Sequence, residues 1–263
     1  MTANDHYEVL AIRYAERNNR IRADSFIFTD DHTSSHPMDY FVWLIRNETR
    51  TILVDTGYDA TEAAQRGRPI LVEPVEALAN IGITPEIIDS IIVTHLHYDH
   101  AGGLAQFPQA RLHLQEAEMA YATGPCMCHG TLRMPFTADH VCETVKRVYA
   151  GKVTFHDGTS QIAPGITVHR IGGHSRGLQC VRVETANGPV VLASDASHYY
   201  ENYQRKVPFP LVVDVEDMLK GFDQLERLAG PGGRIIPGHD PLVRAKYPRA
   251  FEGSRADVRR LDL

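Results

Sequence analysis

The stretch Thr94-His95-Leu96-His97-Tyr98-Asp99-His100 decides how the rest of the 263-residue sequence is interpreted. It brings three imidazoles and a carboxylate together within six residues, directly after an apolar segment at 90–94 that has the composition of a buried strand. Imidazole nitrogen and carboxylate oxygen are suitable ligands for Zn, Mn, Fe and Co. Since the alternation lets neighbouring side chains point to two adjacent positions, the run predicts two metal sites.

Three later positions add ligands of the same types, each beside glycine or small residues at the predicted end of a strand. They are His174 in Gly172-Gly173-His174-Ser175, Asp195 in Ser194-Asp195-Ala196 and His239 in Pro237-Gly238-His239-Asp240. Glycine beside a ligand permits unusual backbone angles and close approach of the chain to a metal. The sequence therefore holds enough ligands for a metal pair.

The composition is that of an ordinary globular chain, with 43% hydrophobic and 23% charged residues. The net charge of -6, and the lack of a Lys/Arg cluster interleaved with aromatic residues, argue against a nucleic-acid partner. At this length we expect one domain, spanning residues 1–263.

Neither an export signal nor a membrane span is visible in the sequence. Residues 1–10 are polar and acidic, and no apolar run approaches the roughly 18 residues of a spanning helix. We therefore expect a soluble, cytoplasmic protein. Its four cysteines are expected to be free thiols, and the segment Cys126-Met127-Cys128-His129 to be part of a lid rather than a metal site, because Cys-x-Cys lacks the usual ligand gap.

Hydrophobic periodicity predicts an alternation of strands and helices. Antiparallel strands are expected over residues 7–14, 40–46 and 51–55, because apolar and polar residues alternate there. Further strands are expected at 90–94, 152–156, 165–171, 178–184 and 189–194, with a hairpin turn at Asn187-Gly188. Helices are expected at 74–80, 115–122, 138–150 and 215–228, and residues 123–136 are expected to form an irregular loop over the site.

The motif His95-x-His97-x-Asp99-His100, with the later histidine, aspartate and histidine in order, resembles the signature of the metallo-β-lactamase superfamily. The resemblance spans residues 55–239. It implies an α/β fold, the αββα sandwich of two mixed β-sheets flanked by helices, with metals at one edge of the sheets.

The same resemblance implies roles for the individual ligands and two divalent ions, with Zn as the first expectation and Mn, Fe and Co as alternatives. The first ion would be held by His95, His97 and His174, the second by Asp99, His100 and His239, with Asp195 bridging both. Asp55 matches an early aspartate of the family that orients ligands through hydrogen bonds.

A metal pair of this kind predicts a hydrolase. A hydroxide that bridges the two ions would attack a carbonyl, and the ions would stabilise the developing oxyanion. Asp99 is expected to pass the proton to the leaving oxygen. The natural substrates of such chemistry are esters, thioesters, lactones and amides.

Within the superfamily, the stretch from His95 to Gly103 is most similar to the N-acyl homoserine lactonase group, which predicts a lactonase acting on a small lactone or ester. A thioesterase of the glyoxalase II type is the alternative. Lactonases of this group carry a tyrosine three residues after the bridging aspartate, where this chain has His198. His198 could replace that tyrosine as a donor to the lactone carbonyl, or Tyr199 or Tyr200 could reach in instead. Since similar lactonases are commonly dimers, a homodimer is also expected.

Overall fold

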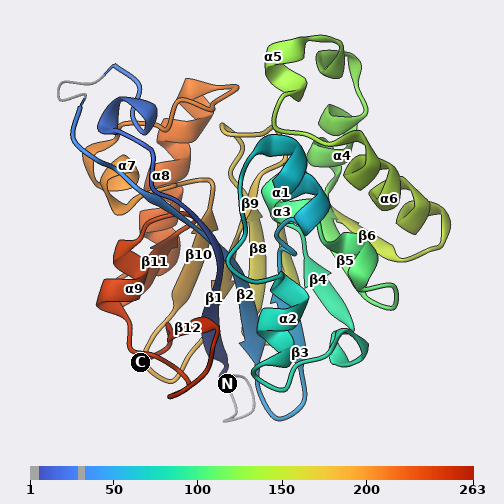
Figure 1. Cartoon of the computed structure of the whole chain (residues 1–263), viewed down its shortest axis with the longest axis vertical. Helices are drawn as coiled ribbons and strands as arrows, with labels where there is room; N and C mark the ends of the chain where they lie inside the picture. The colour runs from blue at the N-terminus through green and yellow to red at the C-terminus, as the bar shows by residue number, and fades with distance from the viewer. Residues whose placement is uncertain (1–5, 29–32) are drawn as a thin grey trace.

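Two mixed β-sheets pack face to face with helices on their outer faces in the computed structural model, which describes residues 6–28 and 33–263 (Figure 1). The first sheet has the strand order β12-β1-β2-β3-β4-β5-β6, and the second the order β11-β10-β9-β8-β7. The predicted αββα sandwich is confirmed.

The elements have the following bounds. The first sheet contains β1 (Glu8–Arg17), β2 (Met38–Arg46), β3 (Thr51–Val54), β4 (Ser90–Ile92), β5 (Arg111–Gln115), β6 (Val153–His156) and β12 (Asp257–Arg260). The second contains β7 (Thr159–Ala163), β8 (Ile166–Arg170), β9 (Gln179–Val183), β10 (Val190–Ser194) and β11 (Arg234–Pro237). The α-helices are α1 (Ala60–Arg66), α2 (Pro74–Ala79), α3 (Tyr98–Ala101), α4 (Glu116–Ala122), α5 (Gly130–Arg133), α6 (Ala138–Tyr149), α7 (Tyr200–Arg205), α8 (Val215–Ala229) and α9 (Leu242–Lys246).

The first sheet changes from antiparallel to parallel at β3. The strands β1, β2 and β3 pair antiparallel, as predicted from their alternating residues, whereas β3, β4, β5 and β6 run parallel. Strand β9 pairs antiparallel with β10, and Gly188 in the turn between them has φ +95°, which confirms the hairpin predicted at Asn187-Gly188.

Alternation of side chains gives the first sheet two buried faces. Trp43 and Val54 point toward the second sheet and lie in one apolar cluster with Leu192 of β10. Their neighbours Leu44 and Leu53 point the other way, into a cluster beneath the helices. Each fully buried side chain of this size contributes about 1.5–3 kcal/mol relative to leaving it exposed, so the two faces hold the sandwich together.

Four strands and several helix boundaries differ from the predictions. Strands β5, β7 and β12 were not predicted, and of β11 only the end before His239 was expected. Strand β5 occupies the residues directly before α4. Residues 123–136, predicted as an irregular loop, contain a 3₁₀ turn at Pro125–Cys128 and the short helix α5. Short apolar runs do not distinguish strand from helix by period alone, and one-turn helices leave no periodic signal.

The candidate ligands follow the ends of strands that run in the same direction. Asp55 follows β3, the histidine run follows β4, Asp195 follows β10 and His239 lies just after β11. Strands β3 and β4 pair in parallel, as do β10 and β11, so their ends meet at the same edge of each sheet. The two sheets therefore present their ligand-bearing loops together.

None of the helices in the described ranges is long and apolar enough to cross a membrane. All four cysteines are unpaired, with Cys180 buried and Cys128 and Cys142 exposed. The prediction of free thiols is confirmed.

Gly177 lets the loop after His174 pack directly on helix α4. A Cβ at this position would lie 2.1 Å from the backbone nitrogen of Glu118, which cannot rotate away. We expect Gly177→Ala to lower the free energy of unfolding by about 3 kcal/mol in a urea titration, the upper end of ordinary overpacking. Gly130→Ala is the control, because no heavy atom lies within 4 Å of its added Cβ. Equal stability of the two variants would contradict this packing.

Candidate metal centre

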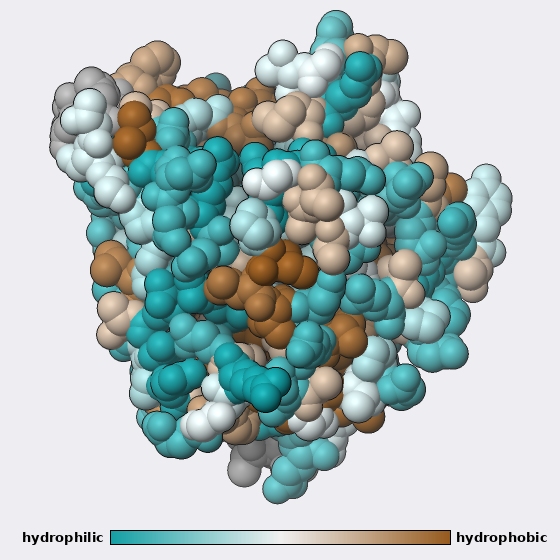
Figure 2. Space-filling view, in the orientation of Figure 1, coloured by the Kyte–Doolittle hydropathy of each residue, from teal (hydrophilic) through white to brown (hydrophobic). Residues whose placement is uncertain are grey.

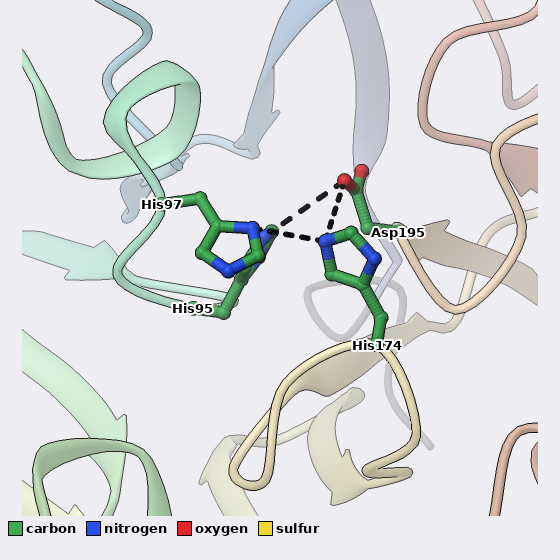
Figure 3. A group of neighbouring side chains, drawn as sticks. All are labelled: His95, His97, His174 and Asp195. Atoms are coloured by element: carbon green, nitrogen blue, oxygen red, sulfur yellow. Dashed lines mark hydrogen bonds and ion pairs between the residues drawn. The ribbon is translucent and has the colours of Figure 1, made fainter. Parts of the chain in front are cut away.

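Four side chains from three loops converge on one point at the edge of the sheets, as Figure 3 shows for His95, His97, His174 and Asp195. Nε2 of His174 lies 2.9 Å from Nδ1 of His97 and 3.1 Å from Oδ2 of Asp195. Nε2 of His95 lies 3.8 Å from the same carboxylate oxygen. All four side chains are buried, so they form an enclosed set of three nitrogens and one oxygen.

A second group lies on the other side of Asp195 and contains Asp99, His100 and His239. Oδ1 of Asp195 is 3.0 Å from Nε2 of His239 and 3.3 Å from Nε2 of His100. Oδ2 of Asp99 is 3.9 Å from each of these two nitrogens. One oxygen of Asp195 therefore faces each group, which is the arrangement expected of a bridging carboxylate.

Hydrogen bonds fix the orientation of several imidazoles through the nitrogen that points away from the centre. Nδ1 of His174 is 2.7 Å from the carbonyl oxygen of Leu211, and Nδ1 of His239 is 2.9 Å from that of Asp39. A carbonyl oxygen can only accept, so Nδ1 carries the proton in both rings. Nε2 then presents a lone pair to the centre, as a metal ligand must.

Several polar atoms at the centre have no hydrogen-bond partner among the described residues. They are Nε2 of His95, Nε2 of His100, Nδ1 of His198 and Oδ1 of Asp195, all in buried residues. Burial and neighbouring imidazoles lower the pKa of His95 and His97 well below the usual value. The uncharged rings of His95 and His97 and the unpartnered ligand atoms fit the requirements of divalent metals, because an unpaired buried polar atom otherwise costs about 1–3 kcal/mol.

Asp55 orients one of these ligands, as the sequence predicted. Its carboxylate accepts hydrogen bonds from the backbone nitrogen and hydroxyl of Thr94, both at 2.7 Å, and contacts Nδ1 of His100 at 2.7 Å. Asp55 has a positive φ of +59°, so the backbone turns sharply where β3 ends. The residue thereby ties the end of β3 to the histidine run.

We expect Asp55→Asn to weaken metal binding by about 10- to 100-fold, the usual effect of losing a hydrogen-bond partner behind a ligand. The amide removes the negative charge that faces the ring of His100. Zinc affinity measured by competition with a chelator checks the expectation, and Asp89→Asn is the control because Asp89 is exposed. Unchanged affinity in Asp55→Asn would show that His100 needs no such partner.

Glu118 is a buried residue of the site that the sequence analysis missed. Its carboxylate accepts hydrogen bonds from the backbone nitrogens of Leu96 and Gly177, both at 2.9 Å, and from the hydroxyl of Ser175. Burial raises its pKa in spite of these donors. Glu118 connects the loop that carries His95 and His97 to the loop that carries His174.

The segment Gly173-His174-Ser175-Arg176-Gly177 has the Gly-x-Ser-x-Gly spacing of a serine nucleophile elbow. Its structure does not match one. Such an elbow joins a strand to a helix, whereas this segment lies between β8 and β9. The hydroxyl of Ser175 is fully buried and donates to Glu118. Ser175 is therefore a structural residue.

His198 lies at the centre, whereas Tyr199 and Tyr200 do not. Nε2 of His198 is 3.1 Å from Oδ2 of Asp195, and its ring stacks on Phe209 at 3.7 Å. The hydroxyl of Tyr199 donates to the carbonyl of Pro37 at 3.3 Å, outside the cavity over the centre. The expectation that Tyr199 acts in catalysis is thus at odds with the structure, because Tyr199 opens helix α7 and its side chain packs against His36.

A cavity of about 540 Å³ opens above the two groups. Of the segment at 123–136, Thr131, Met134 and Pro135 line it, and the ring of Phe136 packs at 4.6 Å on His97. The expected position of this segment over the site is confirmed for its second half. None of the four residues expected to form part of a lid, Cys126, Met127, Cys128 and His129, lines the cavity.

This chain belongs to the metallo-β-lactamase superfamily, whose family model matches residues 37–239. Among its relatives is an N-acyl homoserine lactonase of a Bacillus species, 30% identical over 196 residues, or 67% of this chain and 72% of the relative. The N-acyl homoserine lactonase of Bacillus thuringiensis is 29% identical over 230 residues, covering 80% and 85%. The predicted resemblance to this group is confirmed.

Solved structures support the same fold. An N-acyl homoserine lactone hydrolase with the product N-hexanoyl-L-homoserine bound at its catalytic metal centre has a TM-score of 0.77 and 24% identity, covering 92% of this chain and 97% of that one. A dizinc quorum-quenching lactonase in complex with a product has a TM-score of 0.65 and 18% identity, covering 89% and 87%.

Proposed function

We propose that this protein is a dinuclear metal-dependent hydrolase that opens the ring of a small lactone. The observation that carries the proposal is the position of Asp195, whose two oxygens each face a separate group of buried ligands. We assign His95, His97 and His174 to one ion and Asp99, His100 and His239 to the other, with Asp195 between them. The named relatives, which are lactonases, favour lactones among the ester substrates.

Two divalent ions, with zinc as the first expectation, would supply an activated water and polarise the ester carbonyl. The chain itself contributes the enclosure and the proton transfer. Asp99 lines the cavity while its Oδ2 faces His100 and His239, so its carboxyl group can reach both the centre and a bound substrate. We assign to Asp99 the transfer of a proton to the leaving oxygen.

We further propose that His198 donates a hydrogen bond to the substrate carbonyl, in the place where related lactonases carry tyrosine. His198 lines the cavity beside Asp195, and burial lowers its pKa to about 3, so the ring is neutral and carries one N–H. Because Nε2 faces Oδ2 of Asp195 at 3.1 Å, donation to a substrate requires this proton on Nδ1, which has no hydrogen-bond partner among the described residues. We expect His198→Phe to lower kcat/KM for lactones by about 10- to 100-fold and His198→Tyr to retain most activity. Both variants should keep two metals, whereas loss of an ion would mark His198 as a ligand.

The three buried clusters support treating residues 1–263 as one domain, since one of them contains strands of both sheets. We further propose that the protein forms a homodimer and that it degrades acyl homoserine lactone signals. The proposed signal degradation rests on the lactonase relatives, and the proposed homodimer rests on the resemblance of the sequence to the lactonase group.

A substrate panel tests the proposed function. Metal-quantified protein would be assayed with short- and long-chain acyl homoserine lactones, simple γ- and δ-lactones, and S-lactoylglutathione as the thioester control. Hydrolysis of lactones that is lost on treatment with a chelator is expected. Turnover of the thioester alone would contradict the lactonase proposal and favour a thioesterase of the glyoxalase II type.

A further inference from the structure

We propose that the substrate carries an anionic group, a carboxylate or a phosphate, in addition to the ester bond that is cleaved. The inference rests on the proposed function, because it concerns the substrate of the same centre. Three arginines line the cavity above the candidate ligands, namely Arg17 at the end of β1, Arg20 in the loop that follows, and Arg68 just after α1. None of them forms an ion pair with a carboxylate within residues 6–28 and 33–263.

Arg20 provides the strongest evidence because it is buried and incompletely paired. Only 7% of the residue is exposed, and its Nε has no hydrogen-bond partner among the described residues. Its Nη2 donates to the carbonyl oxygen of Asp24 and lies 3.4 Å from the hydroxyl of Ser25. These are neutral acceptors, and a buried guanidinium ordinarily requires a charged one. An anion bound where Arg20 lines the cavity would supply a charged partner for its guanidinium.

The guanidinium of Arg20 lies close to the candidate centre. It is 5.3 Å above the ring of Phe209, which stacks at 3.7 Å on His198, and His198 contacts Asp195. A single aromatic ring thus separates Arg20 from a residue that touches the bridging carboxylate. Because Arg20 and Asp195 both line the cavity, a small molecule bound there can contact both residues.

Arg68 is held near the same centre by different contacts. Its guanidinium donates to the hydroxyl of Tyr98 and lies 5.1 Å from the centre of the tyrosine ring. Tyr98 directly precedes Asp99 in the sequence. Arg17 is half-buried, and its Nε contacts the side-chain oxygen of Asn19 at 3.4 Å. Arginine offers a planar fork of donors that matches the oxygens of a carboxylate or phosphate.

The charge of the cavity favours an anion once the candidate ligands are set aside. Among the described residues that line the cavity, one carboxylate remains besides Asp99 and Asp195, and it belongs to Asp24. Oδ2 of Asp24 already accepts a hydrogen bond from the backbone nitrogen of Ile21 at 3.1 Å. Three positive side chains therefore face one negative side chain. A neutral substrate would leave this excess uncompensated.

The remaining wall is apolar and limits the shape of the substrate. Met38, Met134, Phe209 and Leu211 line it. In Figure 2 the upper outline of the molecule is notched between the lobe that carries α7 and the lobe that carries α5. The inferred substrate is thus a compact acidic lactone or ester with one apolar side.

Matched substrates test the inference. One lactone would carry a free carboxylate, the second its methyl ester, and the third a phosphate at the same position. The metal-loaded protein is expected to hydrolyse one of the two anionic compounds at least about 10-fold more efficiently than the ester, and the preferred anion identifies the group. Raising the salt concentration should lower kcat/KM for that anion and leave the ester unaffected.

Arginine variants test which side chains cause the preference for an anionic substrate. Arg20→Met is expected to lower kcat/KM for the preferred anion by about 10- to 100-fold and to change the ester less than about threefold. Because Arg20 is buried, Arg68→Met provides a second test at a half-buried position, with Arg111→Met, at an exposed position, as the control. A mere loss of structure would reduce the hydrolysis of all three compounds equally.

The outcomes separate this inference from the proposed function. Hydrolysis of the ester with no preference for either anion, and no response to salt, would overturn the inference alone. Failure to hydrolyse any of the three lactones, with two metals bound, would instead overturn the proposed lactonase function on which the inference depends.

Discussion

Asp195→Ala is expected to remove the metals and abolish hydrolysis. The carboxylate is the shared member of both ligand groups, so its loss leaves each group one oxygen short and brings uncompensated imidazoles together. The loss of metal affinity should exceed the roughly 10- to 100-fold effect of losing an outer hydrogen-bond partner. Metal content by mass spectrometry and lactone hydrolysis measured on the same preparation check both effects.

Asp157→Ala is the matched control for this variant, because the side chain of Asp157 is 78% exposed and forms one surface ion pair with Arg170. Surface pairs of this kind contribute about 0–1 kcal/mol, so metal content and activity should remain those of the wild type. Two ions retained in Asp195→Ala would refute the bridging position assigned to this residue.

Asp99→Asn is expected to lower kcat for lactones by about 100- to 10,000-fold, the usual range for removing a general acid. The amide oxygen can still face His100 and His239, so two ions should remain bound. Metal content and kcat would both be measured on the same preparation, and a loss of kcat without a loss of metal is expected. Asp139→Asn, at an exposed surface position, is the control. Full activity in Asp99→Asn would assign the proton transfer to another group.

The candidate ligands could be predicted from the sequence because several of them lie close together in the chain. Three histidines and an aspartate within six residues are recognisable without a fold, and the later ligands stand beside glycines at the ends of strands. The order of these residues matched a known signature, which supplied the αββα sandwich. Asp55 was predicted for the same reason.

The residues that support the ligands were not predictable in this way. Glu118 contacts Leu96, Ser175 and Gly177, which are 22, 57 and 59 residues away in the chain. No local pattern distinguishes it from an ordinary glutamate in the first turn of a helix. Arg20 likewise appears in the sequence as one of many surface arginines, and only the fold shows that it is buried.

Tyr199 illustrates the opposite failure. A tyrosine near Asp195 was a reasonable candidate because the lactonase group carries one three residues after the corresponding aspartate, but in this chain the third residue is His198 and Tyr199 is the fourth. His198 takes the inward position, and the hydroxyl of Tyr199 is directed to the carbonyl of Pro37. The spacing from Asp195 indicated the inward position correctly, whereas the residue type alone favoured the neighbouring tyrosine.

Titration of metal-free protein with zinc tests directly whether Asp195 joins two ligand groups into one hydrolytic centre. Lactone hydrolysis would be followed against the number of bound ions. The expected result is that activity rises to a maximum at two ions per chain and that Asp195→Ala shows no such rise. Full activity with one ion, or with none, would contradict it.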